Sequence, residues 1–150
     1  MFLFLSRLTP LVNVDLLISD EKQRFLLAWR EDEYDGPGWH VPGGIIRFKE
    51  SAAQRIRQVA RLELGAEVGC DATPVAVHEH LRAERNTRGH FISLLYRCWL
   101  LTPPDQARQA SSDRPSRGQW RWHGAWPQDI IDGQSGYQRY FDATGTAPRT

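Results

Sequence analysis

One carboxylate, Glu63, stands out because of its place in a predicted helix. The helix, over residues 52–64, is rich in Ala, Gln, Arg and Leu and follows a Pro-Gly-Gly turn at 42–44. With about 3.6 residues per turn, Glu63 shares one side of this helix with the apolar Ile56 and Val59. A carboxylate directed toward a protein interior is costly unless it meets a cation, hydrogen-bond donors or a metal ion. The pattern therefore indicates either a metal ligand or a glutamate paired with an arginine.

Three further polar residues occur in or beside predicted strands. Asp15 interrupts the apolar run at 11–19, Arg30 closes the run at 24–30, and His80 follows His78 at the spacing of one strand face. A guanidinium fork matches phosphate oxygens, an imidazole exchanges protons near neutral pH, and Asp is rarely buried without a partner. Each residue also has a structural interpretation: a hydrogen-bonded aspartate, a solvated arginine and a histidine packed in the sheet.

The spacing around Glu63 resembles the signature of the Nudix hydrolases, GX5EX7REUXEEXGU, in which U is a bulky aliphatic residue. Gly44, Glu50, Glu63 and Gly65 match the signature. The resemblance covers roughly residues 9–125, through TPLVNVDLLI, FLLAWR and WHVPGG, and more loosely beyond them.

Three positions depart from the signature, because Gln58 replaces its arginine and Val59 and Leu62 replace two of its glutamates. Those glutamates normally help to hold divalent ions, so ordinary pyrophosphate cleavage is disfavoured. One branch of the family, the GDP-mannose mannosyl hydrolases, keeps only the late glutamate and cuts the glycosidic bond between sugar and diphosphate. The chain resembles this branch.

The resemblance implies a Nudix fold, an α/β/α sandwich around a mixed β-sheet. It implies a homodimer that hydrolyses a nucleotide sugar with Mg²⁺, or Mn²⁺, held by a carbonyl of the Gly-Gly pair, here Gly43, and by Glu63. The other implied positions are Asp15, Arg30 and His80 for catalysis, and Arg30, Arg47 and His90 for substrate binding.

The general base of the branch has no counterpart in this chain. The branch carries a metal-binding Gln and a His base before its last strand, where this chain has Ser116 and Arg117. Arginine cannot act as a general base, and Asp113 and His123 are the nearest substitutes. Two alternatives therefore stay open: an ordinary Nudix nucleoside-diphosphate pyrophosphohydrolase, and a non-catalytic domain that binds a nucleotide sugar or a protein partner.

The apolar pattern predicts an α/β domain. Strands are expected at 11–19, 24–30, 73–82 and 90–101, the last of these the longest, and short strands at 119–123 and on both sides of the Pro-Gly-Gly turn. The first two strands are expected to pair as a hairpin. The central helix is expected to begin at Ser51 or Glu50 and to end at Gly65, and a short helix is expected around 134–141. Residues 103–118 contain almost no apolar side chain and predict a mobile loop.

The 150 residues predict a single domain, 1–150, with 41% hydrophobic residues, enough for a core. A net charge of +1 gives no whole-molecule reason to expect nucleic acid as a partner. Cys70 and Cys98 have neither metal-site nor redox spacing, which predicts reduced thiols in the cytoplasm. The apolar start at 1–5 is interrupted by Arg7 and Pro10, so neither a signal peptide nor a membrane partner is expected. This start is expected to pack on the domain or on a second subunit.

Overall fold

The structure, a computed structural model, describes residues 2–143. Met1 and residues 144–150, which the single-domain prediction includes, lie outside the described residues. The elements in chain order are α1 (Phe2–Leu5), β1 (Leu11–Ile18), β2 (Phe25–Arg30), β3 (Gly38–His40), β4 (Gly43–Ile45), α2 (Ala52–Val59), the π-helical turn η1 (Ala60–Leu64), β5 (Val68–Cys70), β6 (Ala76–Leu81), β7 (His90–Leu100), the 3₁₀ turn η2 (Gln106–Arg108), β8 (Trp120–His123), the 3₁₀ turn η3 (Ser135–Tyr137) and α3 (Gln138–Ala143).

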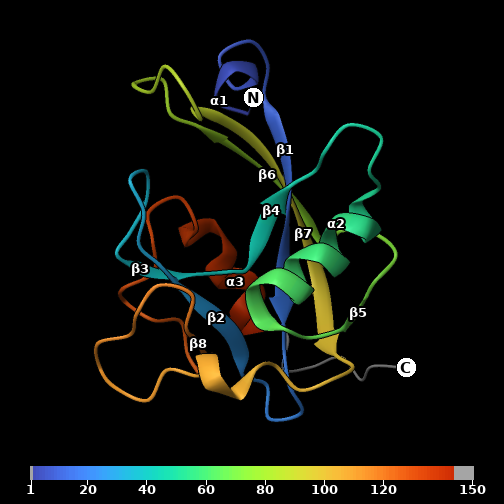
Figure 1. Cartoon of the computed structure of the whole chain (residues 1–150), viewed down its shortest axis with the longest axis vertical. Helices are drawn as coiled ribbons and strands as arrows, with labels where there is room; N and C mark the ends of the chain where they lie inside the picture. The colour runs from blue at the N-terminus through green and yellow to red at the C-terminus, as the bar shows by residue number, and fades with distance from the viewer. Residues whose placement is uncertain (1, 144–150) are drawn as a thin grey trace.

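The strands form two sheets (Figure 1). The larger sheet has the order β4-β1-β7-β5, with β6 also paired to β7. It is mixed, because β1 and β7 run parallel with residues 11–18 opposite 91–98, whereas β4, β5 and β6 pair antiparallel to their neighbours. The smaller sheet, β3-β2-β8, is antiparallel throughout. The predicted mixed sheet is therefore confirmed.

The hairpin predicted for 11–30 is wrong. β1 and β2 lie in different sheets, joined by a single isolated bridge between Ser19 and Phe25. The carboxylate of Asp20 accepts hydrogen bonds from the backbone of Lys22 and Arg24, and Gln23 is left-handed with φ 62°. This tight turn reverses the chain, while β1 pairs with β7 and β4 instead of with β2.

Two apolar cores hold the layers together. In the first, α2 packs on the larger sheet through Ile56 and Val59, which share one buried cluster with Val14 and Leu16 of β1. The second lies on the opposite face of that sheet, between it, the smaller sheet and the C-terminal helices; its buried residues are Leu17, Phe25, Leu27, Trp39, Val41, Leu95, Ala110, Tyr137 and Phe141. Helices thus cover both sides of the strands, as the predicted α/β/α arrangement requires.

The central helix begins and ends where the sequence predicts. The Ser51 side chain accepts from the Gln54 backbone, and the Gln54 side chain accepts from the Ser51 backbone, which forms a capping box. The last turn widens into the π-helical turn η1 and stops at Gly65, with φ 62°. The widened turn was not predicted. Such turns are rare and often mark functional sites, and this one carries Glu63.

Two connecting segments differ from expectation. The short strand β5 was missed, because Val68–Cys70 offers only three residues of pattern. The 103–118 segment contains η2 and is attached to the domain: the Asp105 N–H donates to the Leu64 carbonyl at 2.7 Å, and the Trp120 indole donates to the Asp105 carbonyl at 2.8 Å. Within residues 2–143, no helix has the length and hydropathy needed to cross a bilayer.

Candidate functional site

A cleft of about 900 Å³ opens beside β1, β4, β6 and the turn η1. Six of the residues with an implied role line it: Asp15, Arg30, Gly43, Arg47, Glu63 and His80. His90 does not line it, because side chains alternate along β7 and Ser93 faces the cleft. On the other face of the sheet, the His90 Nε2 atom lies 3.0 Å from an oxygen of Glu79.

Glu63 reaches the cleft next to the Gly-Gly turn. The backbone N–H of Gly43 donates to its carboxylate. The Oε2 atom is buried and has no hydrogen-bond partner within the described residues. Burial, together with the nearby Asp15 carboxylate, raises the pKa of Glu63 to about 8. Across residues 2–143 no arginine forms an ion pair with Glu63, so the metal-ligand interpretation is the one that the geometry favours.

Asp15 is buried and held on both oxygens. Asn13 donates to Oδ1 at 3.1 Å, and the Tyr137 hydroxyl donates to Oδ2 at 2.5 Å. The Ser93 hydroxyl in turn donates to the side-chain Oδ1 atom of Asn13 at 2.9 Å. Burial raises the pKa of Asp15 to about 6, although these donors oppose the rise. A Cβ atom at Gly43 would lie 2.1 Å from Asp15 Oδ1, so this position accepts only glycine.

Tyr137→Phe is expected to lower the free energy of unfolding by about 1–3 kcal/mol, because it leaves a buried carboxylate oxygen without its donor. Urea unfolding of both proteins measures the change. Tyr140→Phe is the matched control, since its hydroxyl contacts only the exposed Arg139 side chain among the hydrogen bonds of the described residues. Equal losses in the two variants would contradict a specific role for the Tyr137–Asp15 bond.

The donor set of the cleft fits a hard divalent cation. No cluster of three or more His, Cys, Asp or Glu side chains suited to a metal occurs within residues 2–143, which agrees with the loss of two signature glutamates. Mg²⁺ prefers oxygen ligands, keeps several waters and is often held by one or two carboxylates. The unpartnered Oε2 of Glu63, beside the second acid Asp15, meets this requirement. The carbonyl of Gly43 remains a ligand implied by the resemblance.

Arg30 lines the cleft but is already engaged by two carboxylates that sequence reasoning missed. Its Nε atom lies 2.7 Å from Asp32 and its Nη2 atom 3.3 Å from Asp35. Asp32 also accepts from the backbone of Tyr34 and Asp35; although burial opposes the effect, the Arg30 hydrogen bond and these donors lower the pKa of Asp32 to about 2. Arg85 bonds the same loop through Asp35 and the Tyr34 carbonyl. The guanidinium of Arg30 is thus fixed in one orientation.

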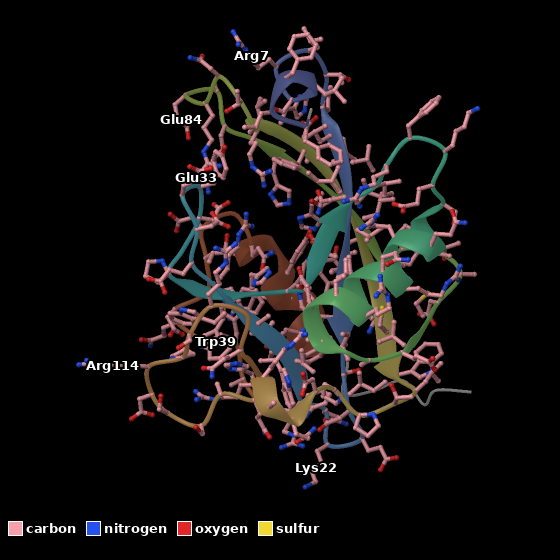
Figure 2. All side chains as sticks on the ribbon, viewed as in Figure 1. Arg7, Lys22, Glu33, Trp39, Glu84 and Arg114 are labelled. Atoms are coloured by element: carbon pink, nitrogen blue, oxygen red, sulfur yellow. The ribbon has the colours of Figure 1, made fainter. Side chains whose placement is uncertain are left out.

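The loop after β2, which holds Arg30 through Asp32 and Asp35, meets a second loop at the edge of the cleft. Figure 2 shows Glu33, in the loop after β2, and Glu84, in the loop between β6 and β7, on the same side of the molecule. The bonds from Arg85 to Asp35 and Tyr34 join these two loops. The acidic run after Arg30 was the one sequence signal for this arrangement.

Two imidazoles line the cleft, His80 from β6 and His40 from β3. Burial lowers the pKa of both rings, assisted for His80 by the nearby His78 and Arg82. The His40 Nδ1 atom lies 2.8 Å from the carbonyl oxygen of Ala28, which can only accept, so Nδ1 carries the proton. The neutral ring therefore has its lone pair on Nε2. His40 was not predicted as a site residue, since nothing in WHVPGG distinguishes it from a packing residue.

His40 makes the folded state sensitive to acid. Its pKa falls from 6.5 to about 4 on folding, so between these values only the unfolded chain binds the proton. Stability is therefore expected to drop as the pH falls from about 6.5 to 4, by about 3 kcal/mol for this ring. His40→Asn keeps a donor for Ala28 and removes the titration. Urea unfolding at pH 7 and pH 4.5 should show a smaller loss in the variant, and equal losses would contradict this.

The two substitutes considered for the general base do not line the cleft. His123 packs against Trp39 with ring centres 4.6 Å apart, and its Nε2 atom is buried without a hydrogen-bond partner within the described chain. Asp113 is exposed on the loop before β8. Ser116 and Arg117 do line the cleft, as the resemblance implies for their positions.

Comparison with known proteins adds family information to this geometry. A family model described as the NUDIX domain matches residues 9–126. The low-salt glycan biosynthesis protein Agl8 of Haloferax volcanii is 35% identical over 80 residues, which is 53% of this chain and 50% of Agl8.

Solved structures show the same fold. A MutT NUDIX hydrolase from Burkholderia pseudomallei superposes with a TM-score of 0.65 at 22% identity, covering 89% of this chain and 95% of that protein. The MutT protein of Methanosarcina mazei gives 0.67 at 16% identity over 93% and 98%. A UDP-X diphosphatase gives 0.57 at 19% identity over 77% and 51%. The chain thus spans about half the length of Agl8 and of the UDP-X diphosphatase. The Nudix fold expected from the signature is confirmed.

Proposed function

The chain belongs to the NUDIX family of hydrolases, and we propose that it hydrolyses a nucleotide sugar at the glycosidic C–O bond, with Mg²⁺ or Mn²⁺ as cofactor. The products are the free sugar and a nucleoside diphosphate. The names of two similar proteins, one in glycan biosynthesis and one a UDP-X diphosphatase, support a sugar-nucleotide substrate.

The observation that carries the proposal is that Glu63 lacks the two glutamates that accompany it in the helix part of the signature. Val59 is 3% exposed and packs in the core, and Leu62 is 57% exposed at the rim of the cleft. Neither can ligate a metal ion. Glu63 is thus the last of the three glutamates that the signature places at the end of the helix, while the earlier Glu50 is ion-paired with Arg55. In this the cleft resembles the mannosyl hydrolase branch, and ordinary pyrophosphate cleavage, which relies on several carboxylates, is disfavoured.

The proposed reaction follows from the residues of the cleft. A divalent ion at Glu63 would neutralise charge on the departing diphosphate. Arg30, held by Asp32 and Asp35, would face the same diphosphate with a preset orientation. Water attacks the anomeric carbon, the C–O bond breaks, and its electron pair stays on the diphosphate oxygen. The water loses a proton to a base on the opposite face of the sugar, as an inverting reaction requires.

The cleft offers two neutral imidazoles for that base, His40 and His80. Arg117, which occupies the position of the branch's histidine, cannot accept a proton. We assign the proton-accepting role to one of the two histidines, and the kinetics of their variants decide between them.

NMR of a GDP-mannose solution with Mg²⁺ tests the proposal through the anomeric proton and phosphorus signals. Free mannose and GDP are expected. GMP and mannose 1-phosphate would contradict glycosidic cleavage and indicate an ordinary pyrophosphohydrolase. Arg117 in the cleft favours a second candidate, a domain that binds a nucleotide sugar without turnover. Measurable binding without either product pair would establish that candidate. The homodimer and the cytoplasmic location implied by the resemblance stay predictions, and light scattering checks the first.

A further inference from the structure

One end of the cleft is built from three segments that are distant in sequence. These are α1, the loop between β4 and α2, and the loop between β6 and β7, which surround the upper part of the molecule in Figure 1. The Ser6 hydroxyl accepts from the backbone N–H of Arg88 at 2.9 Å, and the ring of Phe2 lies 5.5 Å from the guanidinium of Arg47. The N-terminal segment therefore packs on the domain, as one of the two predicted alternatives has it, and joins the other two segments.

Three arginines from these loops line the cleft: Arg47, Arg82 and Arg88. Arg82 is the neighbour of His80, and both side chains approach Gly133, where an added Cβ would lie 3.5 Å from Arg82 Nη2 and 3.9 Å from His80 Nδ1. Arg88 lies over the rings of Tyr34 and Phe91 at 4.7 and 5.5 Å. Aromatic contacts hold Arg47 and Arg88 in place without neutralising their charge.

The three guanidinium groups differ from four other arginines of the cleft; Arg117, on the loop before β8, also forms no ion pair within the described residues. Arg30, Arg55, Arg85 and Arg108 each form an ion pair with an aspartate or glutamate. Within residues 2–143, Arg47, Arg82 and Arg88 form none, and the Nε atom of Arg88 is buried without an acceptor. A buried donor without an acceptor is costly, so an acceptor supplied by a ligand would stabilise this end.

The charge at this end selects the kind of ligand. Asp132 also lines the cleft, so the three arginines retain a positive excess of two charges. Guanidinium groups donate and never accept, and their fork of donors matches the oxygens of phosphate and carboxylate. A cationic group would be repelled here, and a neutral acceptor would leave the positive charge uncompensated, whereas an anion satisfies both the donors and the charge.

We propose that Arg47, Arg82 and Arg88 form an anion subsite that binds a phosphate or carboxylate group of the ligand, apart from the metal-binding end at Glu63. For the nucleotide sugar this rests on the proposed function. The anionic group is then either a phosphate of the diphosphate or the carboxylate of a sugar acid.

Calorimetric titration in the presence of a chelator tests the subsite separately from catalysis. Without a divalent ion, the end of the cleft at Glu63 offers no metal cation to an anionic ligand, so the remaining affinity comes from the arginines and their variants show which of them contribute. The probes are GDP, a nucleoside-diphosphate hexose and the corresponding nucleoside-diphosphate uronate. The proteins are the wild type, Arg47→Gln, Arg82→Gln and the control Arg57→Gln, which lies exposed on α2 outside the cleft.

Each cleft variant is expected to bind about ten- to a hundredfold more weakly, because it loses hydrogen bonds to a charged group. Arg57→Gln is expected to stay within about twofold. A loss for all three probes would assign the subsite to phosphate, and a loss confined to the uronate would assign it to the sugar carboxylate. Unchanged affinity for all probes in both cleft variants, with unchanged melting temperature, would overturn the subsite. Arginine-dependent binding without turnover in Mg²⁺ would overturn the proposed reaction and leave the subsite established.

Discussion

Glu63→Gln is expected to lower turnover of the proposed nucleotide-sugar substrate by at least about a hundredfold, because it removes the proposed main metal ligand and a bound ion contributes several kcal/mol to the transition state. The amide keeps the size of the side chain and can still accept from the Gly43 N–H. Loss of activity would therefore reflect lost ion binding and not lost packing.

The unfolding temperature separates these effects further. In a chelator, the wild type has two neighbouring buried acids and the variant has one, so Glu63→Gln should melt at an equal or higher temperature. Mn²⁺ titration followed by electron paramagnetic resonance should show binding in the wild type and in Glu67→Gln, whose side chain is exposed, but not in Glu63→Gln. Undiminished Mn²⁺ affinity in Glu63→Gln would exclude Glu63 as the principal ligand.

The second large effect is expected from the histidines of the cleft. Removing a general base typically costs about 10²–10⁴-fold in rate. Either His40→Asn or His80→Gln should therefore lower kcat by this amount, while the other changes it less than about tenfold. Comparison of the kcat profiles against pH identifies the base, since its removal abolishes the acidic limb of the profile. If both variants kept wild-type kcat, neither ring would be the base.

The variant His90→Gln tests whether His90 contacts the substrate. The resemblance assigns His90 to substrate binding, yet the ring lies on the other face of the sheet against Glu79. A KM within about twofold of the wild type would show that the position does not contact substrate in this chain.

The central helix and its carboxylate were predictable because their signals are local. The capping box at Ser51, the stop at Gly65 and the apolar side of the helix all depend on residues within one segment. Asp15 was detected in the same way, as a charge inside an apolar strand.

The partners of these residues were not predictable, because they come from distant parts of the chain. Tyr137 lies 122 positions after Asp15, and Arg85 is 51 positions from the carbonyl of Tyr34 that it contacts. The hairpin prediction failed for a related reason. Proximity in sequence favoured β2 as the partner of β1, whereas the backbone of β1 pairs along its whole length with β7. The widened turn at Glu63 depends on backbone hydrogen bonding that side-chain periodicity does not reveal.

The hydrogen bond from Tyr137 to Asp15 also sets an order of events during synthesis. β1 is synthesised well before Tyr137, because the donor to its buried carboxylate lies 122 residues further along the chain. Until Tyr137 is present, the Asp15 carboxylate is expected to stay hydrated. The parallel neighbour of β1, strand β7, is also missing until the chain has passed His90. The cleft is therefore expected to assemble only after Tyr137 has been added, and chains that stop before this residue should be unable to act on substrate.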